Sequence, residues 1–295
     1  MTAAEQGFLL LTSHLGDPQR KILTVAQLRK LFSRVNAADR QTGERELTCQ
    51  DVVTLGYDRE NAQRIVDLLN QHQQLDWYVK RAEKALCIPI TRASARYPSA
   101  LRGKLGLDCP GCIWARGDVS LLELPAIALV GSRELKQENQ TFAIEVGKQA
   151  ARQGYVLVSG NAAGADKAAQ EACLASGGKV ICVVADQLDS HEIRDNQLFL
   201  SEDSFDMPFT PQRALSRNRI IHALGQMAFV AQCAYGKGGT WDGTTQNLRH
   251  NYSPVFCFAD GSRGIDELIC MGATSVQMVD LTNLSSLKSD IQSFL

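Results

Sequence analysis

Two segments of the chain place glycine and charged residues directly after apolar runs, a pattern that predicts an anion-binding site. Residues 126–133 read Ala-Ile-Ala-Leu-Val-Gly-Ser-Arg, and residues 155–166 read Tyr-Val-Leu-Val-Ser-Gly-Asn-Ala-Ala-Gly-Ala-Asp. Each reads as a buried strand that ends in a glycine-rich turn, and the stretch between them has helical character. The carboxyl ends of two parallel strands would then lie side by side. Backbone N–H groups at a helix N-terminus, together with the Arg133 guanidinium, are suited to phosphate or another anion.

Two further segments should reach the same edge of the sheet. Residues 213–221 contain Arg217 and Arg219 and open a helix, and residues 236–244 form a second glycine-rich loop. Between positions 210 and 250 there are five Lys or Arg residues and one acid, Asp242. This local excess of positive charge is hidden by the formal net charge of −1, which excludes a polycation of the histone kind.

The predicted site therefore has two sets of residues. Those expected to bind phosphate or nucleic acid are Gly131, Ser132, Arg133, Ser159, Gly160, Gly164, Lys167, Arg217, Arg219, Lys237, Gly238, Gly239 and Thr240. Those expected to fix loops through hydrogen bonds to the backbone are Asp166, Asn218 and Asp242. Trp241 is open to two interpretations, stacking on a base or packing in the fold.

The composition narrows the function class. No apolar run approaches the ~20 residues of a membrane span, and the first residues lack a basic signal segment, so a cytoplasmic protein is expected. No Ser-His-Asp order, paired carboxylates or metal-ligand cluster is evident, so we expect neither catalysis nor a cofactor or metal. Nine cysteines argue for reduced thiols. For Cys109 and Cys112, loop cysteines are favoured over a metal site or a reactive pair.

The elements that must position the site fall into two domains. Residues 1–85 show apolar residues at spacings of three and four, which predicts a small helical domain of the helix-hairpin-helix or SAM kind, with Ser13, Thr24, Thr48 and Asp58 as helix caps. This domain is suited to a nucleic-acid backbone, to a protein, or to packing alone. Residues 86–295 are predicted to form the second domain. In it an irregular bridge over 86–124 precedes apolar strands at 126–130, 155–159, 179–185, 227–232 and 254–258, which alternate with helices in a doubly wound, mainly parallel α/β sheet.

At this point the sequence resembles the DprA/Smf family of DNA-processing proteins. The resemblance runs from about Ile88 to Ala273 and rests on several ordered motifs. They are Tyr97-Pro98, Arg116-Gly117-Asp118, Gly131-Ser132-Arg133, the Ser-Gly-x-Ala-x-Gly-x-Asp turn at 159–166, Arg217-Asn218-Arg219-Ile220-Ile221, and the late Gly264, Leu268-Ile269 and Gly272-Ala273.

The resemblance implies an extended Rossmann-like fold that binds single-stranded DNA, loads a RecA-type recombinase and forms a homodimer. Two departures indicate a divergent, short member. Ala163 stands where the family usually has an arginine, and the 236–244 loop is similar to the Gly-Gly-x-Gly-Thr turn of LOG-type phosphoribohydrolases. Because the sequence ends at Leu295, about twenty residues after the last motif, we expect no C-terminal winged helix. The alternative function is a nucleotide sensor or N-glycoside hydrolase of the LOG class.

Overall fold

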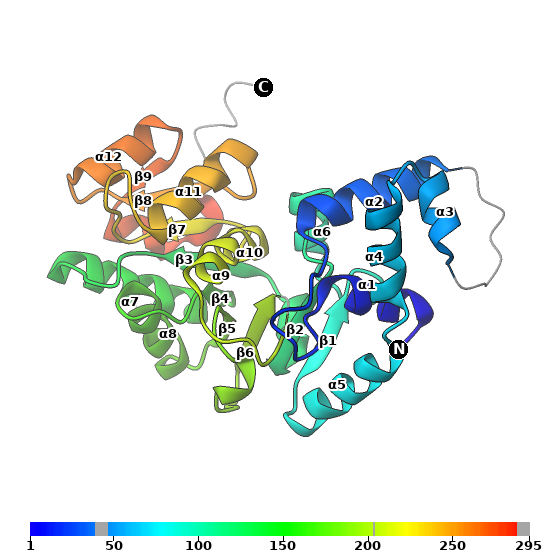
Figure 1. Cartoon of the computed structure of the whole chain (residues 1–295). Coiled ribbons are helices and arrows are strands. Elements are labelled where there is room, and N and C mark those ends of the chain that lie inside the picture. Colours follow the sequence, from blue (N-terminus) through cyan, green and yellow to red (C-terminus); the bar gives the residue numbers. More distant parts are fainter. Residues whose placement is uncertain (39–46, 203, 288–295) are drawn as a thin grey trace.

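The structure is a computed structural model that describes residues 1–38, 47–202 and 204–287 (Figure 1). Its centre is a nine-stranded sheet in the order β1-β2-β6-β5-β4-β3-β7-β8-β9. The strands from β6 to β9 in that order run parallel, whereas β1 pairs antiparallel with β2 and β2 pairs antiparallel with β6. The predicted mixed α/β, mainly parallel class is confirmed.

The helical region that precedes the sheet forms the lobe drawn in blue and cyan in Figure 1. Its helices are α1 (Ala3–Thr12), α2 (Val25–Ala37), α3 (Cys49–Thr54), α4 (Arg59–Leu69) and α5 (His72–Lys84). The side chains of Thr24, Thr48 and Asp58 cap α2, α3 and α4 as predicted, because each accepts a backbone N–H from the first turn. Ser13 is also a helix cap, but it lies at the C-terminal end of α1, where its backbone N–H donates to the Leu9 carbonyl oxygen. Thr2 caps the start of that helix.

The segment from 86 to 124, predicted to be irregular, contains two strands and a helix. They are β1 (Ile88–Thr91), α6 (Ser99–Leu105) and β2 (Cys112–Gly117). β1 and β2 are short, and Pro89 interrupts the apolar pattern of β1, so their sequence signal is weak. Their pairing with the parallel sheet, rather than local propensity, makes them strands.

The remaining elements alternate strands and helices, with the predicted strands at nearly the predicted bounds. The strands are β3 (Ala126–Val130), β4 (Val156–Ser159), β5 (Lys179–Val184), β6 (Gln197–Glu202), β7 (Ala228–Val230), β8 (Val255–Phe258) and β9 (Thr274–Val276). The helices are α7 (Gln137–Arg152), α8 (Ala165–Ala175), α9 (Pro211–Ser216), α10 (Asn218–Leu224), α11 (Gly239–His250) and α12 (Arg263–Cys270). The sequence patterns do not predict β6 or β9.

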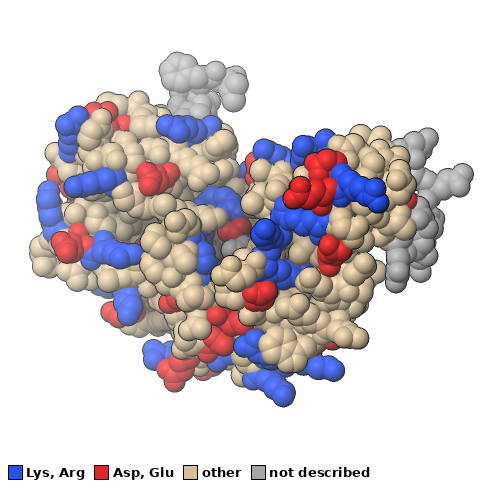
Figure 2. Space-filling model, in the orientation of Figure 1, with Lys and Arg blue, Asp and Glu red and all other residues tan. Residues whose placement is uncertain are grey.

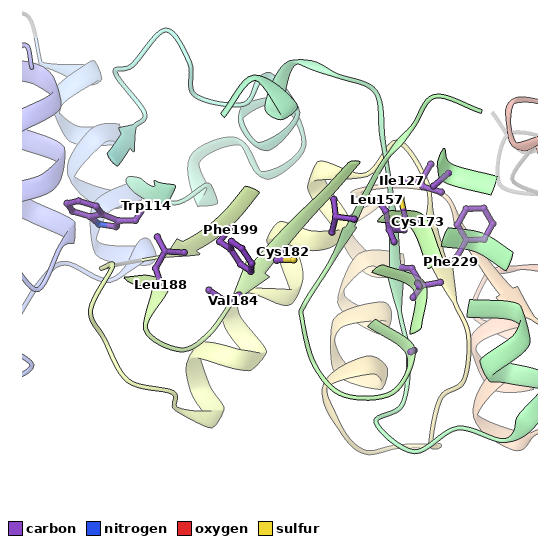
Figure 3. Close-up of a cluster of buried hydrophobic side chains, with 14 of the residues drawn as sticks. Trp114, Ile127, Leu157, Cys173, Cys182, Val184, Leu188, Phe199 and Phe229 are labelled. Carbon is purple, nitrogen blue, oxygen red and sulfur yellow. The ribbon is translucent and has the colours of Figure 1, made fainter. Parts of the chain in front are cut away.

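Both faces of the sheet are covered, which explains the continuous apolar runs. In β3, Ile127 and Leu129 pack on α7 and α8, while Ala128 and Val130 pack on α10 and its neighbours on the other face. Figure 3 shows part of the first layer, from Phe229 through Leu157 and Phe199 to Trp114. Strands such as β3 and β4 therefore bury the side chains on both of their faces, and an unpaired polar residue on either face would be costly.

The helical lobe shares this core. Leu9 and Leu10 of α1 and Tyr78 of α5 belong to the same buried cluster as Trp114 of β2 and Phe205. Tyr78, Trp114 and Phe205 bring their rings to centroid distances of 4.8–5.4 Å. The hydrophobic core thus continues across residue 85, the predicted boundary between the two domains. Within the described ranges, no helix is both long and apolar enough to cross a membrane.

Candidate nucleic-acid interface

The candidate site lies where the strand order of the sheet reverses direction. From β3 the chain proceeds through β4, β5 and β6 toward one edge, and then returns through β7, β8 and β9 toward the other. Ligands of open α/β sheets bind beyond the carboxyl ends of the strands at such a switch point. The ends of β3, β4 and β7 meet there, so the two glycine-rich turns and the 236–244 loop are brought together as the sequence indicated.

The turns after β3 and β4 are packed backbone against backbone. A Cβ on Gly131 would lie 2.5 Å from the Cβ of Ala165, and a Cβ on Gly164 would lie 2.3 Å from the carbonyl oxygen of Arg133. Gly164 also has a φ of +79°, which favours glycine. These glycines let the start of α8 approach the Ser132 carbonyl, which accepts the Ala165 N–H at 3.2 Å. Both turns are therefore held in one rigid unit.

The predicted cradle of bare backbone amides is only partly present. The Ser132 N–H donates to the Gln232 carbonyl oxygen at 3.1 Å, and the Gly160 N–H donates to Asp166 Oδ2 at 3.0 Å. Both amides are used within the protein, so the expectation that they bind an anion was wrong for these two groups. Anion binding at this edge therefore depends on side chains instead of these two amides.

Asp166 holds the second turn from beneath. It is buried, and its Oδ2 accepts the N–H groups of Gly160 and Ala162, the latter at 3.2 Å. Burial raises the pKa of this carboxyl above its ordinary value, while the nearby positive charges of Arg217 and Arg133 oppose the rise. Asp166 therefore fixes the loop and brings a negative charge close to both arginines.

Arg217 occupies the junction between α9 and α10 and presses against the second turn. A Cβ on Gly160 would lie 1.5 Å from Arg217 Nη1, so only glycine leaves space for the guanidinium. Burial lowers the pKa of Arg217, and the charges of Asp166 and Asp186 oppose this effect. Its Nε is buried and has no hydrogen-bond partner among the described residues. A phosphate oxygen would supply the hydrogen-bond acceptor that this Nε lacks.

Two adjoining cavities surround these groups. The larger has a volume of about 690 Å³ and includes Arg133, Arg217, Lys237, Asp166 and Asp242 in its lining. The smaller has a volume of about 160 Å³ and lies over the turn at 160–163 and the end of β5. Arg133, Ala162, Phe209 and Arg217 line both cavities. The two arginines therefore stand where the cavities meet.

The lining of the larger cavity includes both polar and apolar groups. Gly131, Ser132, Gly238, Gly239 and Thr240, which the sequence predicts to bind phosphate or nucleic acid, are among the lining residues. Phe209, Pro211, Ala214 and Leu215 also line the cavity and form what we call its apolar side, and Phe209 and Leu215 are 51% and 45% exposed. The sequence does not predict these four residues as part of the site. Apolar residues at the start of a short helix ordinarily indicate packing inside the protein.

Arg213 holds the apolar side in place. Its Nη1 donates to the carbonyl oxygens of Ala185, Met207 and Pro208 at 2.7–2.8 Å. These bonds tie the loop that carries Phe209 to the end of β5. The loop is thereby positioned over the cavity before any ligand binds.

Asn218 and Asp242 both line the larger cavity, but they differ in their bonding. Asn218 Nδ2 donates to the Gly239 carbonyl oxygen at 2.9 Å and so ties α10 to the start of α11. Asp242 is exposed in the first turn of α11, and its backbone N–H donates to the Gly238 carbonyl oxygen at 3.0 Å. Within the described part of the chain its carboxylate has no hydrogen-bond or ion-pair partner. The loop-fixing role expected for Asp242 is thus not visible in its side chain.

Four predicted residues lie outside the two cavities: Gly164, whose tight packing is described above, and Ser159, Lys167 and Arg219. Ser159 is buried and its Oγ accepts a hydrogen bond from Gln170 Nε2, whereas Lys167 is exposed on α8. Arg219 is buried and forms an ion pair with Glu202, and its Nη1 also donates to the carbonyl oxygen and Oγ of Ser216 at 2.6 Å. We therefore leave Ser159 and Arg219 out of the proposed interface.

Trp241 packs within the protein. Its ring lies 5.1 Å from that of Tyr235 in an edge-on arrangement, and it contacts the core beneath α10. The described cysteines are free thiols, and Cys109 and Cys112 are both buried. No cluster of potential metal ligands occurs among the residues that the structure describes.

Charge is arranged unevenly on the face of the molecule drawn in Figure 2. In Figure 2, Lys and Arg side chains gather on both sides of the hollow between the α/β part and the helical lobe, with acidic side chains among them. In the lining of the larger cavity, three cations (Arg133, Arg217 and Lys237) outnumber two acids (Asp166 and Asp242), which is compatible with a phosphodiester ligand.

Comparisons with known proteins agree with the geometry. A family model described as DNA recombination-mediator protein A matches residues 89–285. The DNA processing protein DprA of Streptococcus pneumoniae is 31% identical over 182 residues, which cover 57% of this chain and 64% of that relative. The chain therefore spans less than two thirds of the length of this curated relative.

Solved structures extend the likeness beyond the matched segment. The crystal structure of DprA from Streptococcus pneumoniae superposes with a TM-score of 0.70 at 26% identity, covering 98% of this chain and 99% of that chain. A DprA structure from Helicobacter pylori, solved to describe a single-stranded DNA binding mode, has a TM-score of 0.56 at 24% identity and covers 67% of this chain and 94% of that chain. The first of these alignments includes the helical lobe as well as the sheet.

Proposed function

Because the chain belongs to the DNA recombination-mediator protein A family, the DprA/Smf proteins, we propose that it binds single-stranded DNA at the carboxyl ends of β3, β4 and β7. One observation carries the proposal. Arg133 and Arg217 meet where two cavities join, and neither makes a hydrogen bond to a described residue through its guanidinium. Successive phosphates of one strand would lie on this pair, and Lys237 would hold the strand at the rim.

The proposed activity is binding without catalysis. The apolar side formed by Phe209 and Leu215 suits the faces of bases, and the cationic side suits the backbone. A double helix keeps its bases stacked and paired, so it could not use the apolar side. We therefore propose a preference for single strands, in line with the binding described for the Helicobacter pylori relative.

The test is a titration of labelled single- and double-stranded oligonucleotides at two salt concentrations between roughly 50 and 300 mM. We expect affinity for the single strand to fall steeply with salt. Arg133→Ala should weaken binding and reduce the slope of log affinity against log salt by about one. Arg249→Ala is the matched control, since Arg249 is exposed at the other end of α11 and outside both cavities. Salt-independent binding, or equal losses in the two variants, would contradict the proposal.

The proposal extends to partners. Loading of a RecA-type recombinase, homodimer formation and a cytoplasmic location are the roles that family membership suggests. Light scattering of the purified chain with and without a single-stranded oligonucleotide tests the dimer. Recombinase filament formation on DNA coated with a single-strand-binding protein tests the loading.

A nucleotide ligand is the second candidate. The larger cavity, at about 690 Å³, is within the size range of small-molecule sites, and the glycine-rich start of α11 lies in its lining. A mononucleotide or nucleotide-derived signal should then raise the melting temperature. If mononucleotides give no shift while single-stranded DNA does, the first proposal stands alone.

A further inference from the structure

Asp242 is an acidic group in a cavity that is otherwise suited to an anion. The cavity lining contains the cations Arg133, Arg217 and Lys237 and the carboxylates of Asp166 and Asp242. Asp166 is buried and engaged with the loop amides, as described above. Asp242 is exposed to the cavity, and among the described residues its carboxylate has no hydrogen-bond or ion-pair partner. It is thus the acid in this lining that a ligand can reach.

The stabilisation of α11 by this carboxylate is small. A carboxylate in the first turn of a helix interacts favourably with the helix dipole, but only by a few tenths of a kcal/mol to about 1 kcal/mol at an exposed site. The same carboxylate weakens the binding of phosphate at that helix terminus. Asp266 shows the structural role alone: it is exposed at the equivalent position of α12, its N–H donates to the Ser262 carbonyl oxygen at 3.0 Å, and it lines neither cavity at the candidate site.

A carboxylate accepts hydrogen bonds and repels phosphate, so it must face a part of the ligand that carries donors. In a DNA strand whose phosphates lie on the two arginines, the available donors are on the base edges. The apolar side of the cavity, at Phe209 and Leu215, offers a surface for the face of that base. A base placed there would turn its edge toward polar groups of the lining, and Asp242 is one of them. Cytosine presents an exocyclic amino group, which is a recognised partner of Asp and Glu.

We propose that Asp242 is a specificity-determining residue that accepts a hydrogen bond from the amino group of a base held in the larger cavity, so that cytosine is preferred to uracil or thymine. Uracil has an oxygen at the position of the cytosine amino group, and that oxygen would face the carboxylate unfavourably. The inference rests on the proposed binding of single-stranded DNA and adds to it a preference among bases.

The test compares oligodeoxycytidine with oligodeoxyuridine of the same length at low salt, because these strands differ only at the base edge. Wild-type protein should bind the cytidine strand about tenfold more tightly, the ratio expected for one charge-assisted hydrogen bond. Asp242→Asn can donate to the uracil oxygen, so it should abolish or reverse the ratio. Asp242→Ala should bind both strands alike, with tighter binding of the uridine strand than wild type. Asp266→Asn, the matched control, should keep the wild-type ratio.

Equal binding of both strands by wild-type protein, or an unchanged ratio in Asp242→Asn, would overturn the assignment while leaving single-strand binding intact. Circular dichroism of each variant separates loss of recognition from loss of folding. Absence of salt-sensitive binding to either strand would instead overturn the proposed function, and this assignment with it.

Discussion

Two arginines of one short segment, Arg217 and Arg219, lie in opposite kinds of environment. Arg217 stands at the cavity junction with its Nε unpartnered among the described residues, and its guanidinium rests against Gly160. Arg219 is buried beneath α9 and α10, where Glu202 and Ser216 take up its donors. The first guanidinium is available to a ligand, whereas the second is part of the protein's own framework.

The comparison shows that the role of each arginine depends on the groups that surround its guanidinium and not on the residue type. Glu202 belongs to β6, a strand that reaches Arg219 only through the folded sheet. Ser216 adds a hydrogen bond to Glu202 Oε2 at 3.0 Å, so the buried pair is well satisfied. The cavity region should therefore control binding, and the buried region beneath α10 should control stability.

Arg219→Ala should have the largest effect, and on stability. Removal of one partner leaves the Glu202 carboxylate buried and uncompensated, which costs roughly 3–5 kcal/mol. Urea denaturation of the variant should show the loss, and a paired change with Glu202→Gln should recover part of it. If the single variant keeps wild-type stability but loses DNA binding, the assignment of Arg219 to the framework is wrong.

Acid should destabilise the same buried region. Burial lowers the pKa of His222 to about 4, against an ordinary value near 6.5, and its Nδ1 accepts a hydrogen bond from Asn247. The unfolded chain then binds more protons than the folded protein between these two values, so stability falls as pH drops from 6.5 toward 4, by about 3 kcal/mol in all.

Denaturation curves recorded across this pH range measure the effect. His222→Gln should flatten the pH dependence, whereas His250→Gln, at an exposed position on α11, should leave it unchanged. A wild-type stability that stays constant from pH 6.5 to about 4 would argue against a neutral buried imidazole.

Much of the fold was predictable because its signals are local. The apolar runs of β3 and β4 are buried on both faces, and a glycine follows each of them directly. Each strand and the turn after it can therefore be predicted from consecutive residues. The residues from 88 to 117 lacked such signals, since β2 becomes a strand through pairing with β6, and β1 through pairing with β2. The convergence of Gly131–Arg133 with the 236–244 loop followed from the alternation of strands and helices.

The candidate site was less predictable because it depends on long-range partners. Nothing near Ser132 in the sequence reveals that its N–H donates to Gln232, a residue beyond the next strand of the sheet. In the same way, Phe209 and Leu215 read as ordinary apolar residues, and the sequence does not reveal the bonds of Arg213 that tie the loop carrying Phe209 to the end of β5. Side-chain roles at the switch point required the folded structure.

Gly160→Ala should weaken ligand binding in the cavity region and leave the stability of the protein nearly unchanged. The new Cβ would overlap Arg217 Nη1, at 1.5 Å, and the flexible guanidinium would have to move away. Since one phosphate contact is then lost, affinity for single-stranded DNA should fall by about tenfold, with a stability change within about 1 kcal/mol. Gly103→Ala, where the added Cβ meets open space, is the control for the substitution itself. Unaltered affinity in Gly160→Ala would show that Arg217 does not contact the ligand.

Lys167→Ala should have the smallest effect and marks the limit of the cavity region. Lys167 was predicted to bind phosphate, but it is exposed on α8 and lines neither cavity. Because Lys167 lies outside both cavities, its ammonium should act on a bound strand through solvent, where charge interactions are screened beyond about 10 Å at 0.1 M salt. Its removal should therefore change affinity less than threefold, well below the loss in Arg133→Ala measured in the same titration. A loss as large as that of Arg133→Ala would extend the interface along α8, and the strand would then follow a path over this helix.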